Sequence, residues 1–211
     1  MLKLRERPPF SKEQVEKWIA DNRPTPFHVY EQEGIVKTAK EFNSAFEFNR
    51  RATPRKRRGF HNKILGICGN GGSLAQASHL AGELVPLGYP CIAFNDQAVI
   101  SSISNDRNYR DIFAFQIKTF KKLLFRVILL TTSGQSDNIK RALFECLQSD
   151  VPVTLITGSV TLEEIFQTDI DMLDNEYYKD YLTQIKFRGE TPEVQEQTLK
   201  FIHHIYREAK K

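Results

Sequence analysis

The stretch from Ile64 to Leu84 reads ILGICGNGGSLAQASHLAGEL, and its order of residue types predicts one strand–loop–helix unit of the fold. An apolar run leads into a glycine-rich corner, and a segment with helical periodicity follows, which predicts a strand, a tight loop and a helix. Glycine tolerates positive φ and lets backbone amides approach an anion, while Ser73 is placed to cap the helix, whose N-terminus attracts negative charge. We therefore expect a phosphate group to bind at this corner.

The predicted helix also carries two polar residues suited to chemistry, His79 and Glu83. Residues four apart lie on one face of a helix, one turn from each other. An imidazole and a carboxylate placed in this way suit a metal ligand and a proton-transfer base. Each residue alone also has a plainer interpretation, as an ordinary polar residue of a helix surface.

The composition favours one globular domain. The chain has 211 residues, 40% of them hydrophobic, which is enough to bury a sizeable core. No apolar run approaches the ~20 residues of a membrane span, and the N-terminal MLKLRERPPF lacks the apolar stretch of a secretory signal. Cys68, Cys91 and Cys146 have no metal-ligand spacing, which favours reduced, packed thiols. We expect a cytoplasmic protein that does not bind membranes.

The positive charge is concentrated between Arg50 and Arg58, where RRATPRKRR has six basic residues in nine positions. Without interleaved aromatic residues or a known binding motif, a solvated loop is favoured over a nucleic-acid site. The run is equally suited to attract an anionic substrate. We do not expect a nucleic-acid partner.

The chain divides into an N-terminal segment and one α/β domain. Ser11–Gln14 has the form of a capping box, and the residues from about His28 to Phe48 have helical periodicity. We expect residues 1–58 to form a helical segment and basic loop that packs on the domain or on a partner subunit. Residues 59–211 form the domain.

Within the domain, β-rich runs alternate with helical segments, which is typical of a parallel α/β sheet. The expected strands are Ile64–Cys68, Cys91–Phe94, Arg126–Thr131, Val153–Ile156 and, more weakly, Ile170–Met172. The expected helices are Ser73–Val85, a short turn after Asp96, Tyr109–Leu124, Gln135–Gln148, Leu162–Phe166 and Thr191–Lys210.

Three polar loops follow strands of this sheet. They are GNGGS at 69–73, SISND at 102–106 and TTSGQS at 131–136. Ligands of open parallel sheets collect at the carboxyl ends of the strands, so we expect these loops to share one site. The third loop offers a phosphate the hydroxyls of Thr131, Thr132, Ser133 and Ser136, around a turn at Gly134.

The last predicted helix carries Gln195 and His203. Eight residues span about two turns and ~12 Å, so one site takes both side chains only at full reach. They therefore serve one site jointly or belong to sites of different protomers.

Together these motifs resemble the sugar isomerase (SIS) domain proteins of the phosphoheptose isomerase type. The shared pattern is CGNGGS with the following His and Glu, an ND pair, a serine-rich TSG loop, and Gln with His eight residues later. The resemblance implies a flavodoxin-like, three-layer SIS domain with a five-stranded parallel sheet, to which the N-terminal helices are added. It also implies a homotetramer with active sites at subunit interfaces.

The implied reaction interconverts sedoheptulose 7-phosphate and D-glycero-D-manno-heptose 7-phosphate, for bacterial heptose precursors of lipopolysaccharide, capsule or S-layer. The resemblance implies that Glu83 and His203 are the acid/base pair, and that zinc is held by His79, Glu83, Gln195 and His203. The implied substrate-binding residues are Asn70, Gly71, Gly72, Ser73, Asn105, Asp106, Thr131, Thr132, Ser133, Ser136 and Gln195.

Elementary chemistry agrees with these roles. Ketose–aldose isomerisation moves a proton between adjacent carbons through an enediol, which needs a base over the carbons and an acid or metal at the oxygens. Glutamine is an unusual zinc ligand, which suggests a weak or exchangeable site.

Two alternative functions share the resemblance. One is a non-enzymatic SIS regulator that binds the initiator protein of bacterial replication; it lacks the glutamate and final histidine that this chain retains at Glu83 and His203. The other is a SIS domain that senses a phosphosugar without converting it. The segment LVPLGYP after Glu83 also lacks the arginine usual in the family, which leaves another sugar phosphate open as the substrate.

Overall fold

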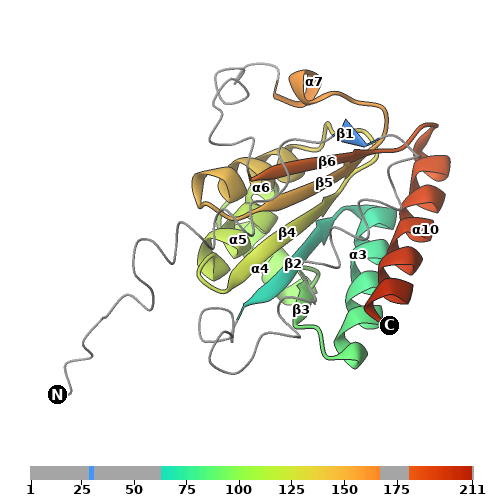
Figure 1. Ribbon diagram of the computed structural model, residues 1–211. Helices are drawn as coiled ribbons and strands as arrows, with labels where there is room; N and C mark the ends of the chain where they lie inside the picture. Colours follow the sequence, from blue (N-terminus) through green and yellow to red (C-terminus); the bar gives the residue numbers. More distant parts are fainter. Residues whose placement is uncertain (1–28, 31–62, 167–180, 211) are drawn as a thin grey trace, which may run out of the picture.

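The computed structural model describes residues 29–30, 63–166 and 181–210 (Figure 1). These residues build one sheet with the strand order β1-β6-β5-β4-β2-β3, in which every neighbouring pair is parallel. The strands are β1 (Val29–Tyr30), β2 (Ile64–Gly69), β3 (Cys91–Ala93), β4 (Leu124–Leu130), β5 (Val153–Thr157) and β6 (Leu182–Lys186).

Helices cover both faces of the sheet and complete three layers. They are α3 (Gly71–Leu84), α4 (Gln97–Asp106), α5 (Ile112–Phe120), α6 (Asp137–Gln148), α7 (Leu162–Phe166) and α10 (Thr191–Ala209), with 3-10 turns η3 (Val85–Leu87) and η4 (Tyr109–Asp111). The predicted α/β class and parallel sheet are confirmed. Five of the strands have three or more residues, and the two-residue β1 extends the sheet at one edge.

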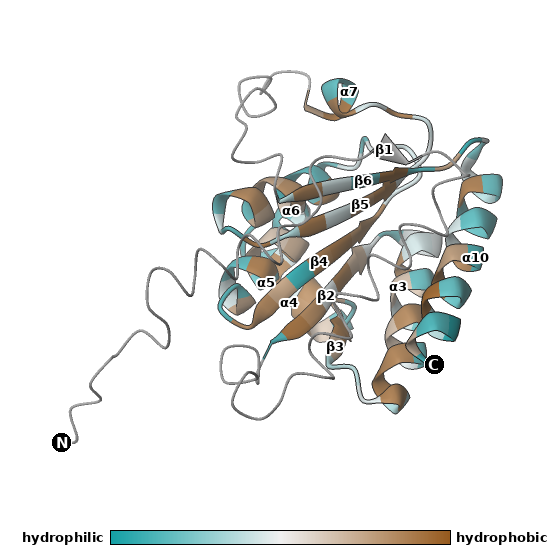
Figure 2. Cartoon of the chain, in the orientation of Figure 1, coloured by the Kyte–Doolittle hydropathy of each residue, from teal (hydrophilic) through white to brown (hydrophobic). Residues whose placement is uncertain are grey.

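The core lies in two clusters because successive residues of a strand face opposite sides of the sheet. Strand β4 shows the alternation: Val127 and Leu129 belong to the cluster under α5, α6 and α7, whereas Ile128 and Leu130 belong to the cluster under α3 and α10. Such double burial explains why the central strands are almost continuously apolar, as the brown colour of β2 and β4 in Figure 2 shows.

The register aligns the carboxyl ends of the central strands. Gly69 of β2 is opposite Leu130 of β4, Leu130 is opposite Ile156 of β5, and Ile156 is opposite Ile185 of β6. The loops that follow these strands therefore start from one edge of the sheet.

The sequence prediction was wrong for the segment after Asp96. A short turn and a polar loop at 102–106 were expected, but α4 runs for ten residues, from Gln97 to Asp106. The Asp96 carboxylate accepts a hydrogen bond from Val99 N at 2.9 Å and caps the helix. Capping thus stabilises a segment whose serines gave little helical periodicity.

The expected fifth strand at Ile170–Met172 lies outside the described residues, and the sequence did not reveal β6. This strand pairs with β5, with Leu155 opposite Gln184. It was missed because Thr183 and Gln184 are buried polar residues, 8% and 1% exposed, which interrupt the apolar pattern of an interior strand.

The helix expected to begin near His28 is wrong at its start, because Val29–Tyr30 is strand β1 and pairs with β6. The pairing partner is more than 150 residues away in the chain, beyond the reach of a local pattern. The rest of that helix, the segment from Ser11 and the Arg50–Arg58 run lie outside the described residues, so the N-terminal segment stays a prediction.

The remaining helices follow the expected order with small shifts. The helix expected from Tyr109 to Leu124 is divided into η4 and α5, and β4 begins at Leu124 rather than Arg126. None of the described helices is long and apolar enough to cross a membrane.

The cysteines are free thiols, as predicted, and burial raises the pKa of Cys91 to about 11.

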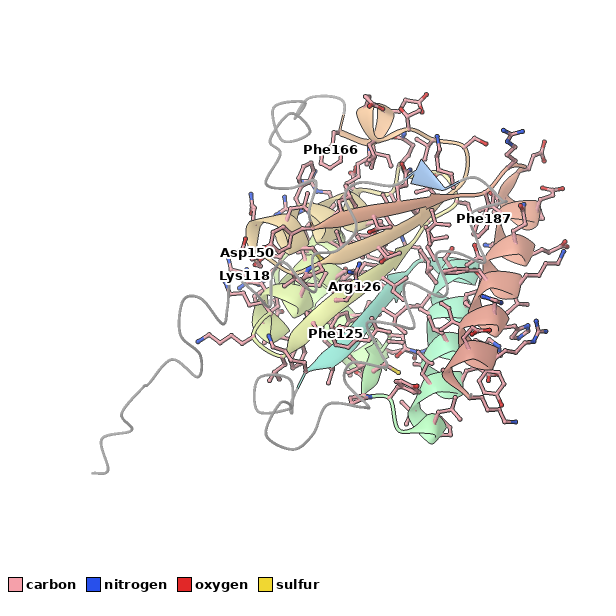
Figure 3. The ribbon with its side chains drawn as sticks, in the orientation of Figure 1. Lys118, Phe125, Arg126, Asp150, Phe166 and Phe187 are labelled. Carbon is pink, nitrogen blue, oxygen red and sulfur yellow. The ribbon has the colours of Figure 1, made fainter. Side chains whose placement is uncertain are left out.

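Strand β4 also carries a partly buried charge, on Arg126. Arg126 extends toward β5, where its Nη1 donates to Thr154 Oγ1 at 3.0 Å (Figure 3). Burial lowers the pKa of Arg126 to about 10, because the charged guanidinium loses its hydration. Among the described residues no carboxylate pairs with it, so this charge costs folding free energy.

We expect Arg126→Met to raise the free energy of unfolding by about 1 kcal/mol, because the substitution removes a partly buried charge that no described carboxylate pairs with, and keeps the apolar stem. In a chain of this size the change corresponds to a rise in Tm of about 2–4 °C in thermal denaturation.

The control for this prediction is Arg141→Met, which removes a paired arginine: Arg141 Nε lies 2.7 Å from Asp111 Oδ1. This control should leave Tm unchanged or lower it. A loss of stability in Arg126→Met larger than in the control would show that the Arg126 guanidinium stabilises the fold.

Candidate active site

Helices α3 and α10 lie side by side and run in the same direction on one face of the sheet (Figure 1). Gly72 at the start of α3 meets Gln195, His79 meets His203, and beyond α3 the Tyr89 hydroxyl donates to Ala209 O at 3.2 Å. The two helices share one apolar cluster, to which they contribute Ala77, Leu80, Leu84, Phe201, Ile202 and Ile205. This packing unites two predicted motifs that are far apart in the sequence.

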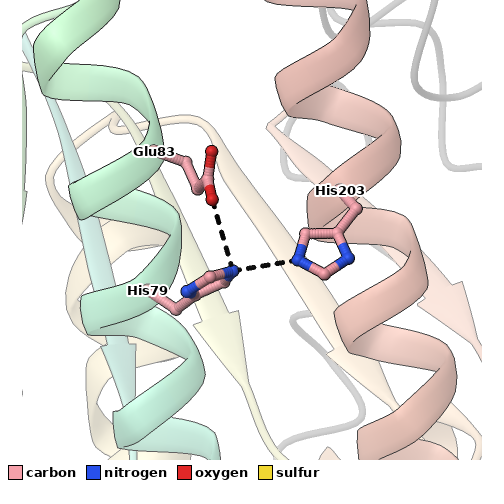
Figure 4. A group of neighbouring side chains, drawn as sticks. All are labelled: His79, Glu83 and His203. Carbon is pink, nitrogen blue, oxygen red and sulfur yellow. Dashed lines mark hydrogen bonds and ion pairs between the residues drawn. The ribbon is translucent and has the colours of Figure 1, made fainter.

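The facing helices bring His79, Glu83 and His203 into one group (Figure 4). His79 Nε2 lies 3.0 Å from His203 Nε2 and 3.7 Å from Glu83 Oε1, and the ligand atoms of all three lie within 4.8 Å of one another. The side chains of His79 and Glu83 are 40% and 26% exposed, so a small molecule can reach the group. One of the two facing nitrogens must carry the hydrogen and the other must accept it.

These three side chains offer a metal ion three ligand atoms, of kinds that bind zinc. Imidazole nitrogen and carboxylate oxygen are common zinc donors, and Zn–N bonds of about 2.0–2.1 Å place tetrahedral ligand atoms about 3.3 Å apart. The separations of 3.0 and 3.7 Å that His79 Nε2 makes lie on either side of that value, and the ligand atoms of His203 and Glu83 lie within 4.8 Å of each other. Three protein ligands also leave a position for a substrate oxygen, as catalytic zinc sites require.

Gln195, the fourth predicted ligand, lies elsewhere on the same pair of helices. A Cβ atom on Gly72 would be 2.5 Å from Gln195 Nε2, so this amide packs directly on the first turn of α3. Its backbone oxygen accepts from Gln76 Nε2 at 2.6 Å. Gly72 precedes His79 by two helical turns, so the Gln195 amide packs on α3 two turns before the group of His79, Glu83 and His203. That Gln195 binds the metal therefore stays a prediction. The absence of a Cβ at Gly72 is what permits the contact.

The glycine corner begins at Asn70, which occupies the N-cap position of α3. Ser73 lies inside the helix and is 6% exposed, so its expected role as the cap is wrong. Gly71 has φ of +51°, which explains the need for glycine directly after the cap. The Asn70 amide pairs with the amide of Asn138 on α6.

The hydroxyl loop connects β4 with α6. Thr131 Oγ1 accepts from Gly134 N at 3.2 Å, and Gly134 has the left-handed φ of +67° that the predicted turn requires. Thr132 Oγ1 lies 3.1 Å from Thr191 Oγ1 at the start of α10. The loop therefore joins the N-terminal ends of two helices, both of which attract anions.

The other residues of this loop are open to solvent or cap α6. Ser133 is exposed and its Oγ accepts from Gln135 N at 3.2 Å, while Ser136 is the N-cap residue of α6. One cation was overlooked in the sequence: Lys140 Nζ donates to Gln135 Oε1 at 2.8 Å and so places an ammonium group at the loop. The sequence could have indicated this role of Lys140, because the residue lies one helical turn after Ser136 of the hydroxyl loop.

The ND pair lies at the end of α4 instead of in a loop. Asn105 and Asp106 are exposed, and Asn105 Nδ2 donates to Asp106 Oδ1 at 3.0 Å. Shortly after them, the hydroxyl of Tyr109 donates to Asn70 Oδ1 at 3.4 Å. Tyr109 and Asn138 are thus site residues that the sequence reasoning missed; the buried amide of Asn138 had no recognisable pattern.

The parallel sheet, the glycine and hydroxyl loops at its carboxyl edge and the His–Glu–His group define a SIS-type α/β protein. No family model matches the chain. Over 142 residues, it is 32% identical to the phosphoheptose isomerase of Buchnera aphidicola subsp. Acyrthosiphon pisum, a match that covers 64% of this chain and 68% of that protein. The chain belongs to the phosphoheptose isomerase family.

Further relatives agree with this assignment. The phosphoheptose isomerase of Thermodesulfovibrio yellowstonii is 46% identical over 88 residues, which cover 38% of this chain and 43% of the relative. Among solved structures, the phosphoheptose isomerase of Francisella tularensis has a TM-score of 0.62 at 24% identity and covers 94% of this chain and 91% of its own. At that identity the structural likeness supports the fold alone.

We expect zinc to bind the purified protein, and His79→Ala to weaken its affinity for zinc by more than about 10-fold, because the substitution removes the central ligand of the group. Isothermal titration of the metal-free protein with zinc measures the affinity.

His204→Ala is the matched control, since this neighbouring histidine of α10 is outside the group. It should bind zinc as the wild type does. Equal affinities in all three proteins would remove His79 from the metal site.

Proposed function

We propose that the protein is an isomerase that interconverts sedoheptulose 7-phosphate and D-glycero-D-manno-heptose 7-phosphate. The observation that carries the proposal is the group of His79, Glu83 and His203, which puts a carboxylate and an imidazole within 4.8 Å of each other beside an open surface. Family membership supports the sugar, because the relatives are phosphoheptose isomerases.

Glu83 acts as the base over the carbons. Its carboxylate takes the proton from C1 of the ketose, and the electron pair of the C–H bond forms the enediol. Return of a proton to C2 then gives the aldose, so the carboxylate ends each turnover in its starting state. The exposed edge of Glu83 allows the sugar carbons to approach.

His203 acts at the oxygens. The ketose carbonyl gains a proton as the enediol forms, and the C1 hydroxyl loses one as the aldehyde forms, so one group must give and take protons at adjacent oxygens. An imidazole suits this role near neutral pH. The contact of His203 with His79 holds its ring toward α3, on the same side as Glu83.

A zinc ion held by His79, Glu83 and His203 would supply a Lewis acid that polarises the sugar carbonyl. Within the chain, His79 keeps the two catalytic groups in place: its Nε2 is the atom that both His203 and Glu83 face. Gln195 of α10, which packs beside the start of α3, is proposed as a fourth metal ligand or as a substrate contact.

The phosphate of the sugar binds at the hydroxyl loop. Thr132, Ser133 and Ser136 offer hydroxyl donors beside the N-terminus of α6, and Lys140 adds a positive charge. Thr131 is 7% exposed and serves mainly to shape the turn at Gly134. We also propose a homotetramer with sites at subunit interfaces, a cytoplasmic location and a role in bacterial heptose precursor synthesis, as the family resemblance implies.

We expect Glu83→Gln to lower kcat by at least about 10³-fold, because the amide cannot accept the carbon-bound proton. Binding of sedoheptulose 7-phosphate should weaken by less than about 10-fold, since the hydroxyl loop is unchanged. Chromatographic detection of the aldose gives kcat, and isothermal titration gives Kd.

The control is Glu163→Gln on α7, an exposed carboxylate outside the site, which should retain the wild-type kcat. If Glu83→Gln isomerises the sugar at the wild-type rate, Glu83 is not the base. A wild-type protein that binds the ketose without converting it would instead identify a phosphosugar sensor.

A further inference from the structure

Two side-chain amides connect the glycine corner with the helix that follows the hydroxyl loop. Asn70 Nδ2 donates to Asn138 Oδ1 at 2.8 Å, and Asn138 Nδ2 donates back to Asn70 Oδ1 at 2.9 Å. The partners are 68 residues apart in the sequence, on the loop after β2 and in the first turn of α6. The reciprocal pair is a direct link between the two halves of the proposed substrate site.

The pair uses nearly all the hydrogen-bonding capacity of Asn70. An asparagine amide has two N–H donors and two acceptor lone pairs. Asn138 and the Tyr109 hydroxyl occupy the acceptor sites of Asn70 Oδ1, and Asn138 occupies one of the donors. Within the described residues, one N–H of Asn70 remains for a ligand, and the pair fixes its direction.

Asn138 is an unusual choice for its position. It is 2% exposed, and a buried amide costs free energy unless it is hydrogen-bonded. Neighbouring buried residues of α6, such as Ile139 and Ala142, are apolar and fill the core without that cost. A requirement to hold Asn70 explains why an amide is buried here.

We propose that Asn138 is a positioning residue that holds the Asn70 amide so that its one remaining N–H donates to an oxygen of the bound sugar. In the proposed function the phosphate binds to the loop immediately before Asn138. The first turn of α6 would then hold both the phosphate and the Asn70 amide. This inference rests on the proposed function for the identity of the sugar, and on the hydrogen bonds alone for the role of Asn138.

A double-mutant cycle tests whether Asn138 acts through Asn70. We expect Asn70→Ala and Asn138→Ala each to lower kcat/KM about 10- to 100-fold. A missing or misplaced donor removes a hydrogen bond that stabilises the transition state. In the Asn70→Ala background, Asn138→Ala should change kcat/KM by less than about twofold. Additive losses in the double variant would overturn the proposal.

Asn138→Asp separates positioning from packing. The carboxylate has the same shape and still accepts from Asn70 Nδ2 but, when ionised, cannot donate to Asn70 Oδ1. Because half of the reciprocal pair is lost, we expect kcat/KM to fall at least about 10-fold. The control Gln116→Ala removes another buried amide, one that donates to Ile112 O within α5. Measured well below its Tm, the control should keep the wild-type kcat/KM. Wild-type kcat/KM in Asn138→Asp would overturn the proposal.

The same cycle, measured as Kd for sedoheptulose 7-phosphate by isothermal titration, separates this proposal from the proposed reaction. If the wild type binds the sugar without turnover, the reaction is wrong, and non-additive losses of affinity would still support the role of Asn138. Absence of any binding by the wild type would overturn both.

Discussion

The site depends on one packing interaction, the parallel contact between α3 and α10 across a single face of the sheet. Their shared apolar cluster fixes the distance and the direction of both helices. At that distance, His79 and His203 meet at 3.0 Å, and a glycine at position 72 lets Gln195 pack on the first turn of α3. The relative positions of His79, Glu83 and His203 are thus set by the hydrophobic packing of α3 and α10 beneath them.

The second half of the site follows from the register of the strands. Since the carboxyl ends of β2, β4, β5 and β6 are aligned, the starts of α3, α6 and α10 come together at one edge. Two pairs of polar side chains join them: Asn70 with Asn138, and Thr132 with Thr191. The helix N-termini proposed to bind the phosphate therefore lie at the same edge of the sheet, and the group proposed for proton transfer lies between two of the helices that start there.

Much of this was predictable from sequence because it depends on local patterns. The strand, glycine corner and helix of 64–84 follow from periodicity, and His79 with Glu83 follows from a four-residue spacing. Strand β6 was hidden because Thr183 and Gln184 are buried but polar, and α4 because its stability comes from the Asp96 cap. The hydrogen-bonded pair of Asn70 and Asn138 depends on tertiary packing of the loop after β2 against the first turn of α6, 68 residues away, which no local pattern encodes.

The separation of His79 and His203 by 124 residues has a consequence for how the site comes into being. Contacts between residues so distant in sequence close a long loop, which costs chain entropy. The histidine pair forms only when α10 has packed on α3, so unfolded or incompletely synthesised chains lack this arrangement of candidate metal ligands. A metal that binds to these residues binds the folded chain and not the unfolded one, so it raises the free energy of unfolding by mass action.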